Sequence, residues 1–382
     1  MSILLAIEKL VCGGQGLARA DGETYFVSDV LPGERIEGVV DGKQGGHPRV
    51  RPVRIVEPSA DRRPLFCPHA GACGGCDWQH IRYTRQVTLK REIADECLRR
   101  IGKIGTVPPF ELFQAEETGY RRRVRFQIDR AGSRMGFFMR DSHRVAAVDR
   151  CPLLCERLNG FLSHLDIGNI PAYCGRIAAI AGGDDTVAST PVISGMSGDS
   201  TVITERGVRF RVRGDSFFQQ NRFLTGALGG WVRDRAQGKR FHDLYGGCGF
   251  FSALLAGSFA SGVLVEQAKQ DADLAAANLR ENGLKNVAVV HGTAEQYLKQ
   301  GSAGPADCIV VDPSRTGLTE TARQAVARCA PGSIVYVSCN PSTQARDLGF
   351  FIHRHGYRLA AFALFDLYPN TSHIETAAVL EK

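Results

Sequence analysis

The sequence predicts an α/β protein with a Rossmann-like, doubly wound sheet at the C-terminus, a small β-barrel at the N-terminus and a β-rich central region. From about residue 206 onward, short apolar strands alternate with helical patterns, which is typical of a parallel sheet covered by helices. Residues 1–58 instead show short strands at about ten-residue spacing, separated by glycine-rich turns, which favours a small barrel. A chain of 382 residues has room for these units.

The apolar runs and the cysteine content of the sequence indicate the class of protein to expect. The sequence contains no run of about eighteen apolar residues and no charged-then-apolar leader, so we expect a cytoplasmic monomer without membrane contact. Its twelve cysteines exceed what an ordinary cytosolic enzyme needs. Because a reducing compartment disfavours disulfides, metal binding or catalysis explains them better.

The N-terminal region is expected to form one domain over residues 1–58. Three β-rich runs carry the prediction, at residues 24–27, 35–40 and 49–56. Pro58 and the charged, proline-bounded segment at 61–64 then indicate a linker. A central domain is expected over residues 59–205 and a third over residues 206–382.

A cysteine motif opens the central region. Cys67, Cys73 and Cys76 are separated by five and two residues, and the intervening glycines let the backbone fold tightly around one metal centre. Zinc takes four tetrahedral nitrogen or sulfur ligands, and an iron–sulfur cubane takes four thiolates, so this spacing leaves both open. Cys151 is the leading candidate for the fourth ligand, with Cys155 in reserve.

A strongly basic stretch follows a helical pattern at residues 81–101. Between residues 120 and 144 there are eight arginines and only two aspartates. Arginine suits bidentate contacts with phosphate, so this stretch is either an RNA-binding surface or the solvated face of a β-meander. The residues proposed for phosphate contacts are Arg121, Arg122, Arg123 and Arg125.

The third region begins with a nucleotide-type pattern. A strand at 241–245 is followed by the glycine turn 246–249 and an apolar helix, and the next strand ends in Glu266, 23 residues after Asp243. A glycine-rich turn with an acid about twenty residues on favours a nucleotide pocket, in which the acid accepts hydrogen bonds from ribose hydroxyls.

Later strands end in polar residues at the same predicted sheet edge. The strand at 308–311 ends in Asp312, and the strand at 333–337 ends before Cys339, where Pro341 prevents its continuation. Ligands of open α/β sheets bind at that edge. Cys339 is therefore either a small buried hydrophobic residue or a nucleophile.

Taken together, these motifs resemble the S-adenosylmethionine-dependent RNA uracil-C5 methyltransferases that carry a [4Fe-4S] cluster, and the resemblance covers almost the whole chain. Residues 1–58 resemble the family's TRAM domain, an OB-like RNA-binding barrel. The family's four cluster ligands fall on Cys67, Cys73, Cys76 and Cys151.

The same resemblance assigns roles in the C-terminal region. The segment 217–221 is similar to the family's F-x-Q-x-N element, and the segments 338–341 and 373–375 are similar to its nucleophile and base motifs. The implied cofactor-binding residues are Gln219, Tyr245, Glu266 and Asp312, and the implied catalytic residues are Cys339 and Glu375. The implied reaction adds the Cys339 thiolate to carbon 6 of uracil, methylates carbon 5 and removes the carbon-5 proton with Glu375.

Three alternatives remain open at this point. A non-catalytic RNA-binding iron–sulfur protein could keep the fold, but it would need neither Cys339 nor Glu375. A DNA cytosine or protein methyltransferase is disfavoured by the TRAM-like barrel and the arginine-rich stretch. For the RNA substrate, ribosomal RNA (23S) is favoured over transfer RNA.

Overall fold

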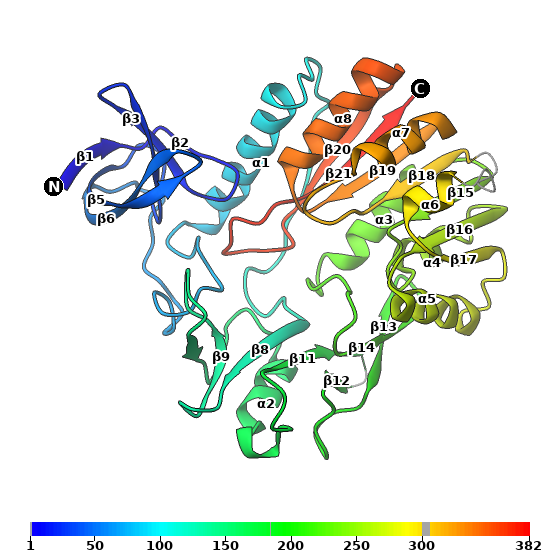
Figure 1. Cartoon of the computed structure of the whole chain (residues 1–382), viewed down its shortest axis with the longest axis horizontal. Coiled ribbons are helices and arrows are strands. Elements are labelled where there is room, and N and C mark those ends of the chain that lie inside the picture. Colours follow the sequence, from blue (N-terminus) through cyan, green and yellow to red (C-terminus); the bar gives the residue numbers. More distant parts are fainter. Residues whose placement is uncertain (1, 184, 300–305) are drawn as a thin grey trace.

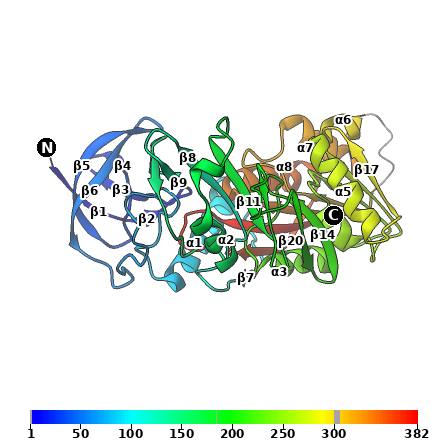
Figure 2. The same ribbon diagram turned by 90° about the horizontal axis from the view of Figure 1, so that it is seen from below.

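The computed structural model describes residues 2–183, 185–299 and 306–382. The N-terminal sheet lies at one end of the molecule, and the C-terminal sheet with its helices occupies the opposite side (Figure 1). A view from below shows the same separation along the long axis, with the central strands between the two (Figure 2). Within the described ranges no helix combines the length and the apolar character that a membrane span requires.

Six strands form the N-terminal sheet, in the order β1-β5-β6-β4-β3-β2. Its core includes Leu5, Val27, Ile36 and Val50. The three predicted runs coincide with β4, β5 and β6, whereas β1 and β2 are the sheet edges, so closure into a barrel stays a prediction. The strands are β1 (Ser2–Ala6), β2 (Lys9–Leu10), β3 (Gly16–Ala20), β4 (Glu23–Val27), β5 (Arg35–Gln44) and β6 (His47–Glu57).

The central region contains an antiparallel five-stranded sheet and a hairpin. The sheet order is β10-β9-β8-β11-β12, and α2 packs on it around Leu158 and Phe161. The hairpin β13–β14 packs against helices of the C-terminal part. The elements are β8 (Arg123–Asp129), β9 (Arg134–Phe138), β10 (Val145–Ala147), α2 (Glu156–His164), the short 3-10 helix η1 (Ile167–Asn169), β11 (Arg176–Ala181), β12 (Val187–Thr190), β13 (Ser200–Glu205) and β14 (Val208–Arg213).

Two elements of the predicted central domain pack with the C-terminal part instead. Helix α1 (Tyr83–Arg100) buries Leu89 and Ile93 in a core shared with the C-terminal helices. Strand β7 (Phe110–Phe113) pairs in parallel with β20, the strand at the far side of the C-terminal sheet. The domain boundaries themselves stay a prediction, but these two elements belong structurally with the catalytic sheet.

The C-terminal sheet has eight strands in the order β17-β16-β15-β18-β19-β21-β20-β7. The first five are parallel, and β21 runs antiparallel to both of its neighbours. Its strands besides β7 are β15 (Arg240–Leu244), β16 (Ser261–Glu266), β17 (Val287–His291), β18 (Cys308–Val311), β19 (Ser333–Ser338), β20 (Arg358–Phe365) and β21 (Glu375–Glu381).

Helices cover both faces of this sheet, as the doubly wound prediction requires (Figure 1). On one face α1, α6, α7 and α8 enclose a core that includes Tyr336 and Leu348. On the other face α3, α4 and α5 enclose a core that includes Trp231 and Phe241. The helices are α3 (Thr225–Arg235), α4 (Phe250–Leu255), α5 (Lys269–Glu281), α6 (Ala294–Lys299), α7 (Glu320–Cys329) and α8 (Pro341–His355).

Candidate functional site

One cavity at the carboxyl edge of the sheet gathers the predicted site residues. The chain order reverses between β15 and β18, because β16 and β17 follow on one side and β19 on the other. Ligands of open α/β sheets bind at such a switch point. A cavity of about 440 Å³ lies there, which is large enough for a nucleoside-sized ligand. Its lining includes Gln219, Tyr245, Glu266, Asp312, Cys339 and Glu375.

The glycine turn after β15 shapes the floor of this cavity. Tyr245 has a left-handed backbone with φ +66°, and Gly249 at φ +89° is the residue that caps α4. A Cβ atom on Gly246 would lie 2.4 Å from the Leu264 side chain. This turn therefore requires glycine for close packing, and it holds a strained tyrosine at the cavity wall.

Glu266 is fixed at the end of β16 by backbone donors. Its carboxylate accepts hydrogen bonds from Gly247 N at 3.0 Å and from Ala268 N at 2.7 Å. Each oxygen keeps lone pairs for further donors. The side chain is therefore oriented to accept hydrogen bonds from a hydroxyl-bearing ligand in the cavity.

Two carboxyl groups with raised pKa values lie at the cavity: Asp243 is buried, and Asp312 is partly buried and lines the cavity. Asp243 accepts hydrogen bonds from Ser252 N and Ser252 Oγ, whereas its Oδ1 has no partner within the described part of the chain. Burial raises the pKa of Asp243 to about 7. Burial, together with the charge of Asp243, also raises the pKa of Asp312 to about 7. Carboxyl groups with such pKa values accumulate at functional sites.

Cys339 stands where β19 gives way to α8. Asn340 caps the helix, because its Oδ1 accepts a hydrogen bond from Ser342 N at 3.0 Å, and Pro341 occupies the first turn, where it needs no donor. Burial first, and then the charges of Glu375 and Asp312, raise the pKa of Cys339 to about 11, although Arg315 opposes them. The isolated site therefore holds a thiol at neutral pH.

Sheet register brings Glu375 next to Cys339. Strands β19 and β21 pair with Ser338 opposite Thr376, so the following residue of β19 lies beside the first residue of β21. The Glu375 side chain is buried, with 2% exposure. Burial and the neighbouring Asp312 raise the pKa of Glu375 well above its ordinary value, and Arg315 opposes this. A thiol and a carboxyl group thus face the same cavity.

Arg315 is a site residue that the sequence interpretation did not single out. It lines the cavity, and its charge favours both the Cys339 thiolate and the Glu375 carboxylate. Its Nη2 lies 3.3 Å from the ring of His373, and its backbone oxygen accepts a hydrogen bond from Asn340 Nδ2 at 2.9 Å. The sequence feature that could have identified Arg315 as a site residue is its position three residues after Asp312, on the same strand-end loop.

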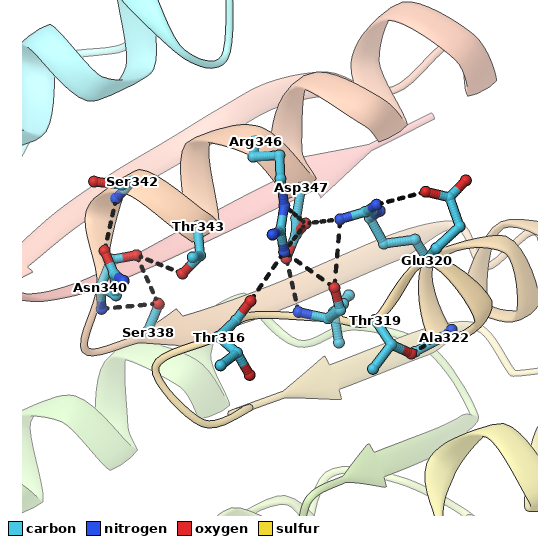
Figure 3. A network of polar contacts seen from close by, with 12 residues as sticks. Thr316, Thr319, Glu320, Ala322, Ser338, Asn340, Ser342, Thr343, Arg346 and Asp347 are labelled. Carbon is cyan, nitrogen blue, oxygen red and sulfur yellow. Dashed lines mark hydrogen bonds and ion pairs between the residues drawn. The ribbon is translucent and has the colours of Figure 1, made fainter. Parts of the chain in front are cut away.

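A buried carboxylate fastens that loop to the sheet and to α8. Asp347 accepts hydrogen bonds from Leu318 N at 2.8 Å and from Tyr336 Oη at 2.7 Å, and it pairs with Arg323. Arg346 donates to Asp347 and also to the Thr316 and Leu318 carbonyl groups (Figure 3). The segment between β18 and α7, which carries Asp312, is therefore held rigidly against the helix that follows Cys339.

The four predicted cluster cysteines meet in a second, small cavity. Cys67, Cys73, Cys76 and Cys151 all line it, together with apolar side chains, whereas Cys155 does not. Burial raises the pKa of Cys76 to about 11. Among the described residues no three His, Cys, Asp or Glu side chains are close enough to hold a single metal ion.

The donor set suits a cluster better than an ion. A tetrahedral zinc ion with Zn–S bonds of about 2.3 Å would draw four sulfurs to within about 3.8 Å of one another. A [4Fe-4S] cubane has irons at alternate corners, each bound by one thiolate, so its thiolates lie further apart. Of the nearby histidines, His69 lies 2.7 Å from Asp149 and His80 is buried elsewhere, 3.5 Å from the Val30 carbonyl oxygen. His69 and Arg121 also line the cavity, and its four thiols are the donor set that an iron–sulfur cubane takes.

The four arginines proposed for phosphate contacts do not form one exposed surface. Arg121 lines the cysteine cavity, 5.7 Å from the Tyr120 ring centre. Arg122 forms a nearly buried ion pair with Glu205 at 2.8 Å. Three of these four arginines make contacts within the protein and are at least partly buried, namely Arg121, Arg122 and Arg123. Of the four, only Arg125 is exposed. Local charge density cannot distinguish arginines that bridge domains from those that face solvent.

Comparisons with known proteins agree with this geometry. The family model for tRNA (uracil-5-)-methyltransferase matches residues 197–382. The chain is 31% identical to the 23S rRNA (uracil(1939)-C(5))-methyltransferase RlmD of Alkalilimnicola ehrlichii, over 99% of this chain and 96% of that protein. It is 32% identical to an uncharacterized RNA methyltransferase of Aquifex aeolicus, over 99% and 98% of the two chains.

A solved structure shares the fold over the full length. The Pyrococcus abyssi tRNA (uracil-54, C5)-methyltransferase, in complex with S-adenosyl-L-homocysteine, aligns with a TM-score of 0.74 and 22% identity, and the alignment covers 99% of this chain and 100% of that chain. The methyltransferase α/β fold predicted for the C-terminal part is thereby confirmed. The chain belongs to the family of S-adenosylmethionine-dependent RNA uracil-C5 methyltransferases.

Proposed function

We propose that this enzyme methylates carbon 5 of a uridine in 23S rRNA through a covalent bond between Cys339 and carbon 6 of the uracil. The observation that carries the proposal is the placement of Cys339 and Glu375, which face one cavity from neighbouring strands. S-adenosylmethionine supplies an electrophilic methyl group on its sulfonium sulfur. A thiol paired with a carboxylate suits the activation of a pyrimidine carbon that is by itself a weak nucleophile.

The proposed roles of the two catalytic residues follow from that chemistry. The Cys339 thiolate adds to carbon 6 and converts the ring to an enolate, so that carbon 5 can form the new bond to the methyl carbon. Glu375 then removes the carbon-5 proton, and the electron pair that is released expels the Cys339 sulfur from carbon 6. Both groups must first give up their protons to solvent, and the charge of Arg315 favours the ionised form of each.

Four further residues are proposed to hold the cofactor in the same cavity. Glu266 is oriented to accept from ribose hydroxyls, and Asp312 lies between it and the reacting pair. Gln219 and Tyr245 line the remaining wall. Because a stacked uracil cannot reach such a recess, the target nucleotide must be single-stranded or flipped out of its helix.

The RNA class rests on the relatives. Several relatives, including those from Alkalilimnicola ehrlichii and Aromatoleum aromaticum, are named as 23S rRNA methyltransferases and match the chain over nearly its whole length. Transfer RNA is the second candidate, favoured by the description of the matching family model. A non-catalytic role in RNA binding is disfavoured, because it would not require the buried thiol and carboxyl pair.

The test of this proposal is a Cys339→Ala substitution in a strain that lacks the native gene. Wild-type protein should restore 5-methyluridine at one position in 23S rRNA, whereas Cys339→Ala should restore none, because carbon 5 stays unactivated. Mass mapping of 23S rRNA and tRNA from both strains provides the measurement. Cys329→Ser, which alters a cysteine outside the cavity, serves as the matched control. Methylated uridine in the Cys339→Ala strain would falsify the mechanism, and methylation restored only in tRNA would change the substrate.

We further propose that Cys67, Cys73, Cys76 and Cys151 hold a [4Fe-4S] cluster. The support is that all four thiols line one cavity, as the resemblance to the cluster-bearing family implies. When bound, the cluster would tie the loop at residues 67–76 to the segment that leads into α2, and it would thereby brace the central sheet.

Anaerobically purified protein should be brown and contain about four irons per chain. Cys151→Ser should lower the iron content and the visible absorbance, because the fourth ligand is lost. Cys155→Ser should leave both unchanged, because this neighbouring thiol lies outside the cavity. Iron analysis and visible spectra measure the effect without reference to activity. Colourless protein with stoichiometric zinc would contradict the proposal.

A further inference from the structure

The turn between β2 and β3 docks the N-terminal sheet onto the catalytic part of the molecule. Trp78 Nε1 donates a hydrogen bond to the Gly14 carbonyl oxygen at 3.2 Å, and a Cβ atom on Gly14 would lie 2.3 Å from Ser372 Cβ. Lys9 on β2 forms an ion pair with Glu96 on α1. The tip of this turn is therefore held close to α1 and to the loop that precedes Glu375.

Two cysteines from distant parts of the chain meet at this junction. Cys12 lies on the turn and is exposed, whereas Cys97 lies on α1 and is 6% exposed. Both line a cavity of about 340 Å³ that also contacts Ser342 at the start of α8. The two side chains thus reach the same cavity from different segments of the chain.

Both thiols also contact the first turn of α8, directly after Cys339. Cys12 Sγ lies 3.9 Å from Asn340 Oδ1, and Cys97 Sγ lies 3.7 Å from Ser342 Oγ. Neither thiol has a role in the methyl transfer described above. Nothing in the methyl-transfer chemistry explains why two thiols should be placed together at this junction.

We propose that Cys12 and Cys97 form a thiol–disulfide exchange site, at which a small-molecule disulfide such as oxidised glutathione closes a covalent link between the N-terminal sheet and α1. The Cys12 thiolate attacks one sulfur of the small disulfide and releases the first small thiolate. Cys97 then gives up its proton and attacks the Cys12 sulfur of the mixed disulfide, which releases the second. Two protein thiols and one small disulfide thus become one protein disulfide and two small thiols.

The environments of the two sulfurs assign the order of attack. Cys12 is accessible to a reagent from solvent. The neighbouring Cys97 side chain lowers the pKa of Cys12 to about 6, despite partial burial. The Cys12 side chain, and then burial, raise the pKa of Cys97. An exposed thiolate beside a protected second thiol is the arrangement of an attacking and a resolving cysteine.

Closing the disulfide would change the catalytic side of the junction. Cys97 loses its S–H group and Cys12 is no longer free, so the contacts of the two sulfurs with Asn340 and Ser342 change next to Cys339. The junction, which is held in the reduced form by Trp78 and the Lys9–Glu96 ion pair, would gain a covalent tie. Oxidation of the pair would thus change the contacts made at the start of α8.

The test is treatment of the intact, cluster-bearing enzyme with oxidised glutathione under anaerobic conditions, followed by alkylation and digestion with trypsin. We expect two free thiols to disappear and the peptides spanning residues 10–19 and 92–99 to become joined. Adding dithiothreitol should separate them. Non-reducing mass spectrometry reports the link directly and does not depend on activity.

Two variants test the attack by Cys12 and the attack by Cys97 separately. Cys97→Ser should stop at a glutathione adduct on Cys12, and Cys12→Ser should leave Cys97 unmodified. Cys329 is a half-buried thiol whose pKa is raised by burial. The control variant Cys329→Ser should therefore form the link between Cys12 and Cys97 as the wild type does. Wild-type enzyme that carries only the mixed disulfide on Cys12, or that stays fully reduced, would overturn the proposal.

Discussion

Glu375→Gln is expected to trap the enzyme as a covalent complex with methylated RNA. The amide keeps the shape of the side chain but cannot accept the carbon-5 proton, so addition of Cys339 and methylation can proceed while release cannot. Loss of a positioned base typically slows a reaction by about 10²–10⁴-fold, which is enough for the complex to persist on a gel. A band that survives denaturation and contains both protein and RNA provides the measurement.

The matched control lies on the same strand. Glu381 is the last residue of β21 and forms an ion pair with Arg358 outside the cavity, so Glu381→Gln should turn over without accumulating the complex. The double variant Cys339→Ala with Glu375→Gln should give no band, because the bond to carbon 6 cannot form. Normal turnover by Glu375→Gln would show that another group removes the proton, and Asp312 would be the next candidate.

The proposed catalytic pair could be singled out because each residue belongs to a local sequence signal. Cys339 ends an apolar strand before a proline, and Glu375 lies in the motif 373–375. Their distance in space does not follow from the sequence, because the two residues are 36 positions apart in the chain. That distance is set by the pairing of β19 with β21, in which a shift of one residue would move Glu375 to the other face of the sheet.

Long-range contacts are what local sequence patterns leave out. Local charge density made Arg122 a candidate for phosphate contacts, but its partner Glu205 lies 83 positions further along the chain. Strand β7 falls within the residues predicted for the central domain, but it pairs with β20. Neither partner can be identified from periodicity, because a strand pattern specifies the alternation of faces and not the neighbour.

A buried ion pair beside the catalytic loop gives a prediction for stability. Lys90 on α1 donates to Asp366 Oδ1 at 2.6 Å and to the Tyr368 carbonyl oxygen at 2.9 Å, and both charged side chains are fully buried. Asp366 begins the loop that leads to Glu375, and its second oxygen has no partner within the described residues. The charge of Asp366 therefore depends on Lys90 for its compensation.

Lys90→Met should lower the free energy of unfolding by about 3–5 kcal/mol, because it leaves an uncompensated carboxylate in the interior. Chemical denaturation followed by fluorescence measures the change, since Trp78 lies 5.8 Å from Lys90 Nζ and is one of only two tryptophans. Lys269→Met removes an exposed i,i+4 pair with Asp273 and should cost only about 0.3–0.5 kcal/mol.

The double variant Lys90→Met with Asp366→Leu distinguishes charge from packing. If the loss in Lys90→Met arises from the unpaired Asp366 carboxylate, removing that carboxylate as well should restore most of the stability, because an apolar pair of similar volume avoids the desolvation of both ions. If the loss arises from packing around α1, the double variant should be less stable than either single variant. The first outcome would mean that the buried charge orients the loop before Glu375 more than it stabilises the fold, and the second would contradict that interpretation.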